Sequence, residues 1–275
     1  MLGPQDAVAG STAERSTIHP ANLQLVDMHC HLDRMANAGE VARAAEQLGL
    51  GIFCTPVTPA DTLHARAVLA HAPNVRVGVG LHPWWIADGR CGEADARAAA
   101  QLAADARFIG EVGLDFSRTR IPSREAQVAA LDGILHACAE HPMPDRVLSI
   151  HAVRSADTVL DLLERYDLTS QATCIFHWFT GTGDELTRAR RLGCRFSVNE
   201  RMLATRKGRA YARAIEERLL LLETDAPPLL DAPYSAEAIA AELTRTLDTL
   251  ALLRATDRND LAAHRAETSR KLLSL

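Results

Sequence analysis

Eight short apolar segments recur along the chain, and stretches with the periodicity of amphipathic helices separate them. Each segment has four to eight residues and is bounded by glycine, proline or polar residues, as buried parallel strands usually are. The segments are Leu23–Met28, Gly51–Val57, Val75–Leu81, Phe108–Leu114, Val147–Ile150, Thr173–Phe176, Cys194–Val198 and Leu219–Leu222. Alternating strands and helices over about 250 residues specify a parallel sheet. We therefore predict an α/β protein that forms a single TIM-like (β/α)8 barrel.

An open, doubly wound sheet is the alternative arrangement of such elements. No glycine-rich dinucleotide-binding motif follows the first predicted strand, which favours the barrel. Helical stretches at 236–253 and 259–273 are expected to pack on its outside. Residues 1–21 are polar and small, and we predict a disordered or expression-derived leader there. Residues 22–275 are predicted to form one domain.

Composition excludes some classes of partner. The net charge is −5 and only two of the 30 basic residues are lysine, so a global basic surface for duplex DNA is not indicated, although a local electropositive mouth is compatible with it. No window approaches about 18 uninterrupted apolar residues, so no membrane partner is expected. The six cysteines are scattered without a paired CxxC spacing, which fits buried thiols in a reducing, cytoplasmic setting.

Residues able to bind a metal ion stand where the predicted strands end. In a parallel barrel these ends meet at one mouth. The first strand ends in Asp27, His29 and His31, which share one face if the strand alternates regularly. The later strand ends carry His82, Glu111, His151, His177, Glu223 and Asp225. Because buried charge is costly unless it is paired or metal-bound, we predict a metal centre at the C-terminal ends of the strands, with satisfied core histidines as the alternative.

Five motifs, in this order, resemble those of the TatD-type metal-dependent deoxyribonucleases. They are Asp27-Met28-His29-Cys30-His31-Leu32-Asp33, Gly80-Leu81-His82-Pro83, Gly110-Glu111-Val112-Gly113-Leu114-Asp115, His177-Trp178-Phe179-Thr180-Gly181 and Glu223-Thr224-Asp225-Ala226-Pro227. The resemblance extends from Leu23 to the C-terminus. It implies that residues 22–275 are a TIM-barrel metal-dependent hydrolase domain that cleaves DNA phosphodiester bonds, acting on single strands or free ends.

The resemblance also implies roles for individual residues. The metal ligands are expected to be His29, His31, Glu111, His151, His177 and Asp225. In a two-metal arrangement His29, His31 and Asp225 hold one ion, His151 and His177 hold the other, and Glu111 bridges them. Glu111 and Asp225 are the expected catalytic residues, with Asp225 taking a proton from the attacking water. The ions are expected to be zinc, manganese or magnesium, and Asp27 is expected to orient an imidazole nitrogen.

Substrate contacts are expected from His82, Arg154 and Trp178. Arginine follows His151 by three residues here, where the family often has it after two. Arginines in the loops after the fourth and seventh predicted strands are candidates for contacts with a phosphate backbone, and Trp84 and Trp85 for contacts with bases.

Further segments resemble one branch of the family, the QatD proteins of anti-phage defence cassettes. They are Arg107-Phe108-Ile109, His177-Trp178-Phe179, Gly193-Cys194-Arg195-Phe196-Ser197-Val198, Met202-Leu203 and Lys207-Gly208-Arg209. This likeness implies partner proteins from such a cassette. Two alternatives stay open: an amidohydrolase-type enzyme acting on a small molecule, and an assembly subunit of a defence complex. Many amidohydrolases carry a carbamylated lysine at the fourth strand, where Glu111 stands here, and this favours the nuclease.

Overall fold

A computed structural model of the chain describes residues 24–275. The predicted leader, residues 1–21, and the start of the first predicted strand lie outside this range. The strands form two sheets in which every pair of neighbours is parallel. One sheet holds β1 (Leu25–Cys30), β2 (Leu50–Cys54) and β3 (Val75–Val77), and the other holds β4 (Val79–Leu81), β5 (Phe108–Asp115), β6 (Arg146–Val153), β7 (Ala172–His177), β8 (Arg195–Val198) and β9 (Leu220–Leu222).

All eight predicted strands are present, and the third is divided in two at Gly78. β3 pairs with β2, whereas β4 pairs with β5, so the chain changes sheets at this glycine. A Cβ at Gly78 would lie 2.5 Å from the carbonyl oxygen of Gly110. Only a residue without a side chain allows the backbone of the neighbouring strand to come this close.

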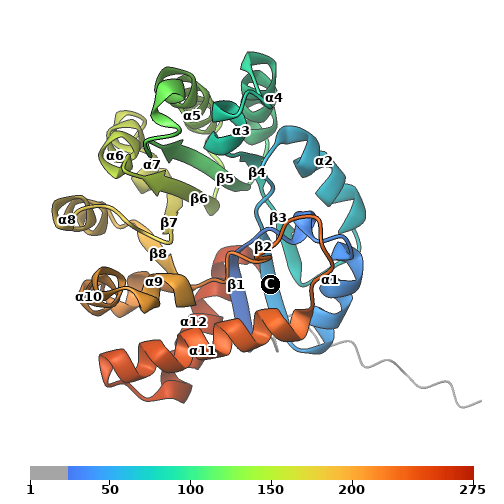
Figure 1. Cartoon of the computed structure of the whole chain (residues 1–275), viewed down its shortest axis with the longest axis vertical. Helices are drawn as coiled ribbons and strands as arrows, with labels where there is room; N and C mark the ends of the chain where they lie inside the picture. Colours follow the sequence, from blue (N-terminus) through green and yellow to red (C-terminus); the bar gives the residue numbers. More distant parts are fainter. Residues whose placement is uncertain (1–23) are drawn as a thin grey trace, which may run out of the picture.

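Backbone hydrogen bonds also link the two sheets at their other edge. The amide of Asp225 donates to the carbonyl of His29 over 2.9 Å, and the amide of His31 donates to the carbonyl of Ala226 over 2.7 Å. Figure 1 shows the strands set around a common centre with the helices outside them. The chain is thus an α/β protein with parallel sheets, as predicted, and the residues that follow β1 and β9 are held side by side.

Helices cover the outer faces of the strands. They are α1 (Ala38–Gln47), α2 (Pro59–Val68), α3 (Pro83–Ala87), α4 (Glu93–Ala104), α5 (Arg124–Glu140), α6 (Ala156–Arg165), α7 (Leu168–Gln171), α8 (Gly183–Arg191), α9 (Glu200–Ala204), α10 (Arg206–Ala214), α11 (Ala236–Arg254) and α12 (Arg258–Leu273). The two predicted C-terminal helices are α11 and α12, and α11 runs along the lower edge of Figure 1. Across residues 24–275, the helices lack the combination of length and apolar character that crossing a bilayer requires.

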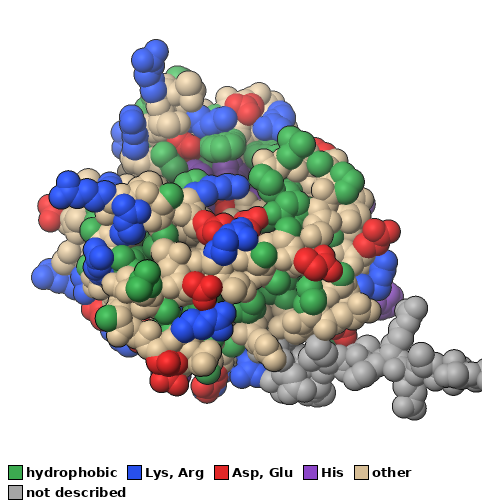
Figure 2. All heavy atoms as spheres, turned by 60° about the horizontal axis from the view of Figure 1, so that its bottom comes forward, with side chains coloured by type: hydrophobic (Ala, Val, Ile, Leu, Met, Phe, Trp, Pro, Cys, Tyr) green, Lys and Arg blue, Asp and Glu red, His purple; other side chains and the backbone are tan. Residues whose placement is uncertain are grey.

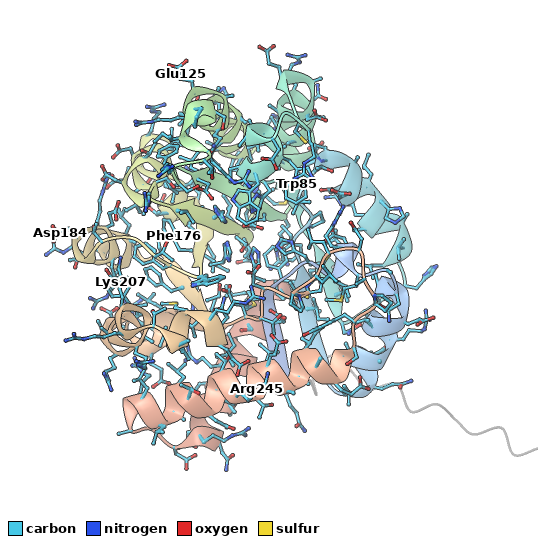
Figure 3. The ribbon with its side chains drawn as sticks, in the orientation of Figure 1. Trp85, Glu125, Phe176, Asp184, Lys207 and Arg245 are labelled. Carbon is cyan, nitrogen blue, oxygen red and sulfur yellow. The ribbon has the colours of Figure 1, made fainter. Side chains whose placement is uncertain are left out.

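The core has two parts. Buried side chains of the strands and helices form the larger part, to which Phe176 belongs. A smaller cluster gathers residues from separate strands, including Met28, Phe53, Ile175 and Leu221. In Figure 3, Phe176 and Trp85 lie nearer the centre, whereas Glu125, Asp184 and Arg245 lie at the periphery. This rigid packing fixes the strand ends, from which the side chains of the site project.

Candidate metal centre

A cavity of about 670 Å³ opens where the strands end. Residues from the ends of β1, β4, β5, β6, β7 and β9 contribute to its wall. Figure 2 shows histidine side chains at the bottom of a hollow, with basic and hydrophobic side chains around it. All the predicted metal ligands except His29, which is completely buried, line this cavity.

Glu111 is the residue around which the site is built. It lies in β5 and is 1% exposed. Gly110 directly precedes it, and Gly113 follows it by two residues. Gly113 has a φ of +148°, and a Cβ at this position would lie 2.0 Å from the carbonyl oxygen of His151. Glycine there lets β5 lie close against β6, so that Glu111 and His151 meet.

One oxygen of Glu111 faces two histidines, His29 in β1 and His31 directly after that strand. Its Oε2 atom is 3.4 Å from Nε2 of His29 and 3.2 Å from Nε2 of His31. Oδ1 of Asp225 lies 3.8 Å and 3.4 Å from the same two nitrogens. These four residues therefore converge on one small volume, although Asp225 is almost 200 residues from His29 along the chain.

The other oxygen of Glu111 faces three imidazoles. Its Oε1 atom is 2.9 Å from Nδ1 of His151, 2.9 Å from Nε2 of His177 and 3.1 Å from Nε2 of His82. The carboxylate thus stands between two sets of donor atoms.

Neighbouring groups hold the outer nitrogens of His29, His31 and His151. Nδ1 of His31 donates to the carbonyl oxygen of Thr55 over 2.8 Å, and Nδ1 of His29 is 2.6 Å from Oγ of Ser149. Nε2 of His151 is 3.4 Å from Oδ2 of Asp115. Such partners turn the opposite nitrogen, with its lone pair, toward a metal ion. Nδ1 of His177 lies 3.8 Å from Oε1 of Glu223 and has no hydrogen-bond partner among the described residues.

The residues present fit a divalent metal ion. Nε2 of His29 and Oε2 of Glu111 are buried and have no hydrogen-bond partner among the described residues. Unpaired buried polar atoms are costly, and a cation between them would remove that cost. The donor atoms of His29, His31 and Glu111 all lie within 4.8 Å of one another, as do those of His29, His177 and Asp225. A set rich in imidazole suits zinc or manganese better than magnesium.

Charge inside the site is strongly redistributed. Burial opposes ionisation of Glu111, but the neighbouring imidazoles His82, His177 and His29 outweigh it and hold the pKa of the carboxyl well below its usual range. Burial likewise opposes ionisation of Asp225, yet the hydrogen bond with His31 and the nearby imidazoles lower its pKa to about 2. Both carboxylates are therefore ionised at neutral pH. An ionised carboxylate can bind a cation or accept a proton.

Burial disfavours the charged form of every histidine in the cluster, and its partners decide the outcome. For His31, the nearby carboxylates of Asp225 and Glu111 overcome burial and raise the pKa well above its usual value. For His29, burial and the charge of His177 prevail and lower the pKa to about 3, so this ring is neutral. The cluster thus combines protonated and neutral imidazoles around ionised carboxylates.

The predicted role of Asp27 is wrong. Its carboxylate does not contact an imidazole nitrogen. It accepts hydrogen bonds from the backbone amide of His29 at 3.2 Å and from the amide and hydroxyl of Thr224 at 3.0 Å and 2.5 Å. The pairing of β1 with β2 shifts between Asp27 and Cys30, which breaks the regular alternation on which the prediction rested. Through its hydrogen bonds with Thr224, Asp27 instead links β1 to the segment after β9.

Glu223 also has a supporting position. It is fully buried and accepts hydrogen bonds from the amide of Trp178, from Asn199 and from the hydroxyl of Ser197. The sequence prediction missed the partners of the outer nitrogens, including Ser149 and Asp115. Asp115 was detectable, because it closes the glycine-glutamate motif, but nothing in the pattern marks Ser149.

The predicted substrate contacts divide into two groups. His82 and Trp178 line the cavity, together with Trp84, Arg120 and Arg201. Arg154 is exposed just after β6, has a φ of 55°, and is not among the lining residues. Arg201 stands at the mouth, where its Nη1 lies 3.3 Å from Oδ2 of Asp225.

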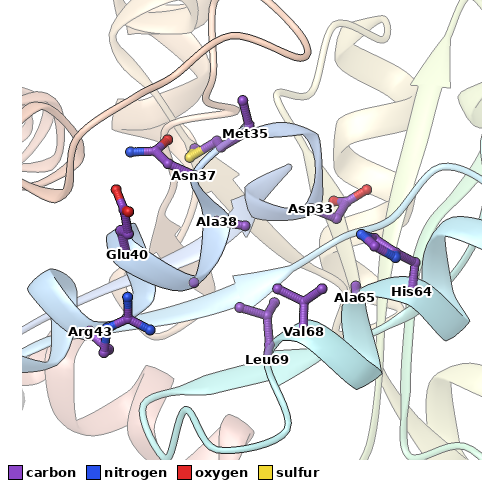
Figure 4. Close-up of a pocket in the computed structure, with 12 residues that line it drawn as sticks. Asp33, Met35, Asn37, Ala38, Glu40, Arg43, His64, Ala65, Val68 and Leu69 are labelled. Atoms are coloured by element: carbon purple, nitrogen blue, oxygen red, sulfur yellow. The ribbon is translucent and has the colours of Figure 1, made fainter.

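A second, smaller hollow of about 250 Å³ lies against α1 and α2. Figure 4 shows Glu40 and Arg43 on one side of it and Asp33 and His64 on the other. Its lining brings together no cluster of metal-binding residues within residues 24–275. The larger cavity is therefore the candidate site.

Comparison with known proteins shows the family to which the chain belongs. The sequence matches the family model described as "TatD related DNase" over residues 26–274. The "3'-5' ssDNA/RNA exonuclease TatD" of Citrobacter rodentium is 28% identical over 243 residues, which cover 86% of this chain and 90% of the relative. The protein of the same name from Klebsiella pneumoniae is 32% identical over 198 residues, covering 70% of this chain and 72% of the relative.

Solved structures show the same fold. A TatD homologue from Escherichia coli superposes with a TM-score of 0.76 at 24% identity and covers 92% of this chain and 99% of its own. The phosphotriesterase homology protein of Escherichia coli, solved with phosphate in its active site, gives a TM-score of 0.55 at 12% identity and covers 90% and 98% of the two chains. At these identities the likeness concerns the fold alone.

Proposed function

The chain belongs to the TatD related DNase family, and we propose that it is a divalent-metal-dependent nuclease that hydrolyses phosphodiester bonds of single-stranded nucleic acid from a free end. The observation that carries this proposal is the position of Glu111 between two sets of donor atoms. Each of its oxygens faces at least two imidazole nitrogens at 2.9 to 3.4 Å. A buried carboxylate in this setting is suited to bridge two cations.

His29, His31 and Asp225 would hold one ion and His151 and His177 the other, with Glu111 shared. Two such ions would supply an activated water and would neutralise charge on the phosphoryl group. Around them the outer hydrogen-bond partners fix the ring orientations, and the buried position of Glu111 keeps its carboxylate away from bulk water.

Asp225 is the proposed proton acceptor. Its carboxylate is ionised at neutral pH, and its Oδ1 atom faces the imidazoles of His29 and His31. Its other oxygen, Oδ2, lies beside Arg201 at the mouth of the cavity. A carboxylate placed between the donor cluster and the solvent can take the proton of the attacking water and release it outward.

A single strand with a free end is the proposed substrate class. The relatives from Citrobacter rodentium and Klebsiella pneumoniae are named as exonucleases of single-stranded DNA and RNA. A net charge of −5 gives no general attraction for duplex DNA, whereas Arg120 and Arg201 provide positive charge at the cavity itself. Trp84 and Trp178 offer aromatic surface for bases.

Digestion of matched linear and circular substrates tests this function. The metal-loaded protein is incubated with an end-labelled single-stranded oligonucleotide and with a covalently closed circle of the same sequence. We expect the linear strand to be shortened from one end and the circle to persist, and Glu111→Gln to abolish the reaction. Equal cleavage of circle and linear strand, or full activity of Glu111→Gln, would contradict the proposal.

We propose two further features of its setting and one of its fold. The segments that resemble the QatD branch support a role in anti-phage defence, which phage plating on cells carrying the wild type or Glu111→Gln tests: protection should require Glu111. Six free and buried cysteines support a reducing cytoplasm. The hydrogen bonds between the residues after β1 and β9 support closure of the two sheets into one barrel.

A further inference from the structure

We propose that His82 is not a metal ligand but a neutral hydrogen-bond donor, whose Nε2–H binds a non-bridging oxygen of the phosphate in the cavity. The inference rests on the proposed phosphodiester hydrolysis and assigns one residue of that site a specific task. It follows from which nitrogen of each imidazole carries the proton.

Distance alone does not separate His82 from the ligands. It is 5% exposed, and its Nε2 atom lies 3.1 Å from Oε1 of Glu111. The donor atoms of His82, Glu111 and His151 all lie within 4.8 Å of one another. By distance alone, these three residues could bind a cation between them.

The outer contacts of the other rings favour ligation. Thr55 presents a carbonyl oxygen to Nδ1 of His31, and a carbonyl only accepts, so Nδ1 carries the proton. When the ring is neutral, Nε2 keeps its lone pair and faces Glu111. His151 likewise presents its outer nitrogen to the carboxylate of Asp115 over 3.4 Å, and an ionised carboxylate also only accepts.

His82 has the opposite contact. The backbone amide of Trp84 donates to Nδ1 of His82 over 3.0 Å. A backbone amide only donates, so Nδ1 must carry the lone pair, and in the neutral ring the proton is on Nε2. A protonated nitrogen cannot bind a metal ion. Nε2–H is instead a hydrogen-bond donor, and in this structure it faces Oε1 of Glu111 at 3.1 Å.

The ring has little freedom to change this arrangement. His82 precedes α3, and the rings of Trp84 and Trp85 pack edge-on against it, with centroids 5.2 Å and 5.5 Å away. The indole of Trp84 is itself fixed, because its Nε1–H donates to Oδ2 of Asp115 over 2.6 Å. Turning the imidazole over would break the bond with the amide of Trp84 and leave that amide without its acceptor.

A donor of this kind suits the negatively charged oxygens of a phosphate. His82 lines the same cavity as Asp225 and Arg201, so a phosphate bound in that cavity would lie near the His82 ring. A fixed neutral donor stabilises charge that grows in the transition state without removing a ligand from an ion. No proton has to leave the ring for this role.

Two variants separate a donor from a ligand. His82→Asn keeps an oxygen able to accept from the amide of Trp84 but withdraws the Nε2–H group, and His151→Asn is the matched ligand variant. The metal content of each zinc-loaded, desalted protein is measured, and binding of inorganic phosphate to the loaded protein is followed by calorimetry. We expect His82→Asn to keep the wild-type metal content and to bind phosphate at least about tenfold more weakly, as loss of a charge-assisted hydrogen bond implies. We expect His151→Asn to lose about one ion.

Loss of an ion in His82→Asn would overturn the inference. Phosphate binding that is equally strong in His82→Asn and the wild type, or absent from both, would also overturn it. Nitrogen-15 spectra of histidine-labelled protein give a second reading: His82 should show the Nε2–H form, and the Nδ1–H form would contradict the assignment. These readouts do not require nuclease activity. Failure to cleave nucleic acid, with metal retention and phosphate binding as expected, would refute only the proposed function.

Discussion

Nε2 of His29 lies 3.4 Å from Oε2 of Glu111, and neither atom has a hydrogen-bond partner among the described residues. Both are buried, so the metal-free protein bears the cost of two unsatisfied polar groups. This pair links the stability of the fold to the occupancy of the site.

Removal of metal should therefore lower the melting temperature. An ion that binds only the folded state at 100 times its Kd adds about 2.7 kcal/mol, or roughly 5 to 10 °C for a chain of this size. Calorimetry with a chelator and with added zinc measures the shift. The variant His64→Gln, whose side chain lies at the separate hollow, should show the same shift as the wild type. Identical melting with and without zinc would contradict a metal centre.

Replacement of Asp225 by Asn should stop turnover while the fold persists. The amide keeps the shape and one acceptor oxygen but cannot take a proton, and loss of a general base costs on the order of 100- to 10,000-fold. The exposed Asp231→Asn, which loses only an ion pair with Arg34, is the control. Rates and melting curves of both variants are compared. Cleavage by Asp225→Asn within about threefold of the wild type, far short of such an effect, would exclude Asp225 as the base.

Asp27 should make the metal-free fold less stable as the pH rises. Burial raises the pKa of its carboxyl to about 8, despite the opposing hydrogen bonds from Thr224 and His29, whereas the ordinary value is 3.8. Between these two pKa values the Asp27 carboxyl is protonated in the folded state and ionised in the unfolded state. The free energy of unfolding is therefore highest below the lower pKa and falls as the pH rises toward the upper one.

Asp27→Asn mimics the protonated carboxyl at every pH. It should therefore unfold at a higher denaturant concentration than the wild type at pH 8, and the difference should shrink toward pH 4. Equilibrium denaturation with chelator present measures this. A difference that does not depend on pH would show that Asp27 is not protonated in the fold.

Arg201 should contribute to substrate binding more than to the chemical step. Its guanidinium lies 5.6 Å above the ring of Trp178 and borders the cavity, with its side chain 44% exposed. Loss of a hydrogen bond to a charged group costs about 1.5 to 3 kcal/mol, so Arg201→Gln should raise KM tenfold or more.

The control for Arg201 is Arg245→Gln on α11, which removes the same charge at the periphery and breaks an ion pair with Glu200. It should leave KM unchanged, and the dependence of KM on salt should weaken only for Arg201→Gln. Equal effects of the two substitutions would mean that total charge, and not the position of Arg201, matters.

The order of strands and helices was predictable because apolar runs and helical periodicity are local properties. The division at Gly78 was not, since the run Val75–Leu81 is continuous in sequence and only the choice of neighbouring strand separates β3 from β4. The position of Asp27 failed for a related reason. A shift in the pairing of β1 depends on β2, which the residues of β1 do not reveal.

That the proposed metal ligands come together was predictable, because they lie in or directly after the C-terminal halves of apolar runs, whose ends meet at one mouth. Their partners were harder to find. Ser149 meets His29 from 120 residues away, and Thr55 meets His31 through a backbone carbonyl that any residue would supply. The proton position on His82 likewise depends on a backbone amide, which no sequence pattern marks.

The most direct measurement of the central claim is the metal content of the wild-type chain. The protein is loaded with zinc, freed of weakly bound ions by desalting, and analysed for metal and protein in the same sample. Because Glu111 stands between two sets of donors, the account predicts a stoichiometry that approaches two ions per chain. A saturating value of one or of zero would contradict it.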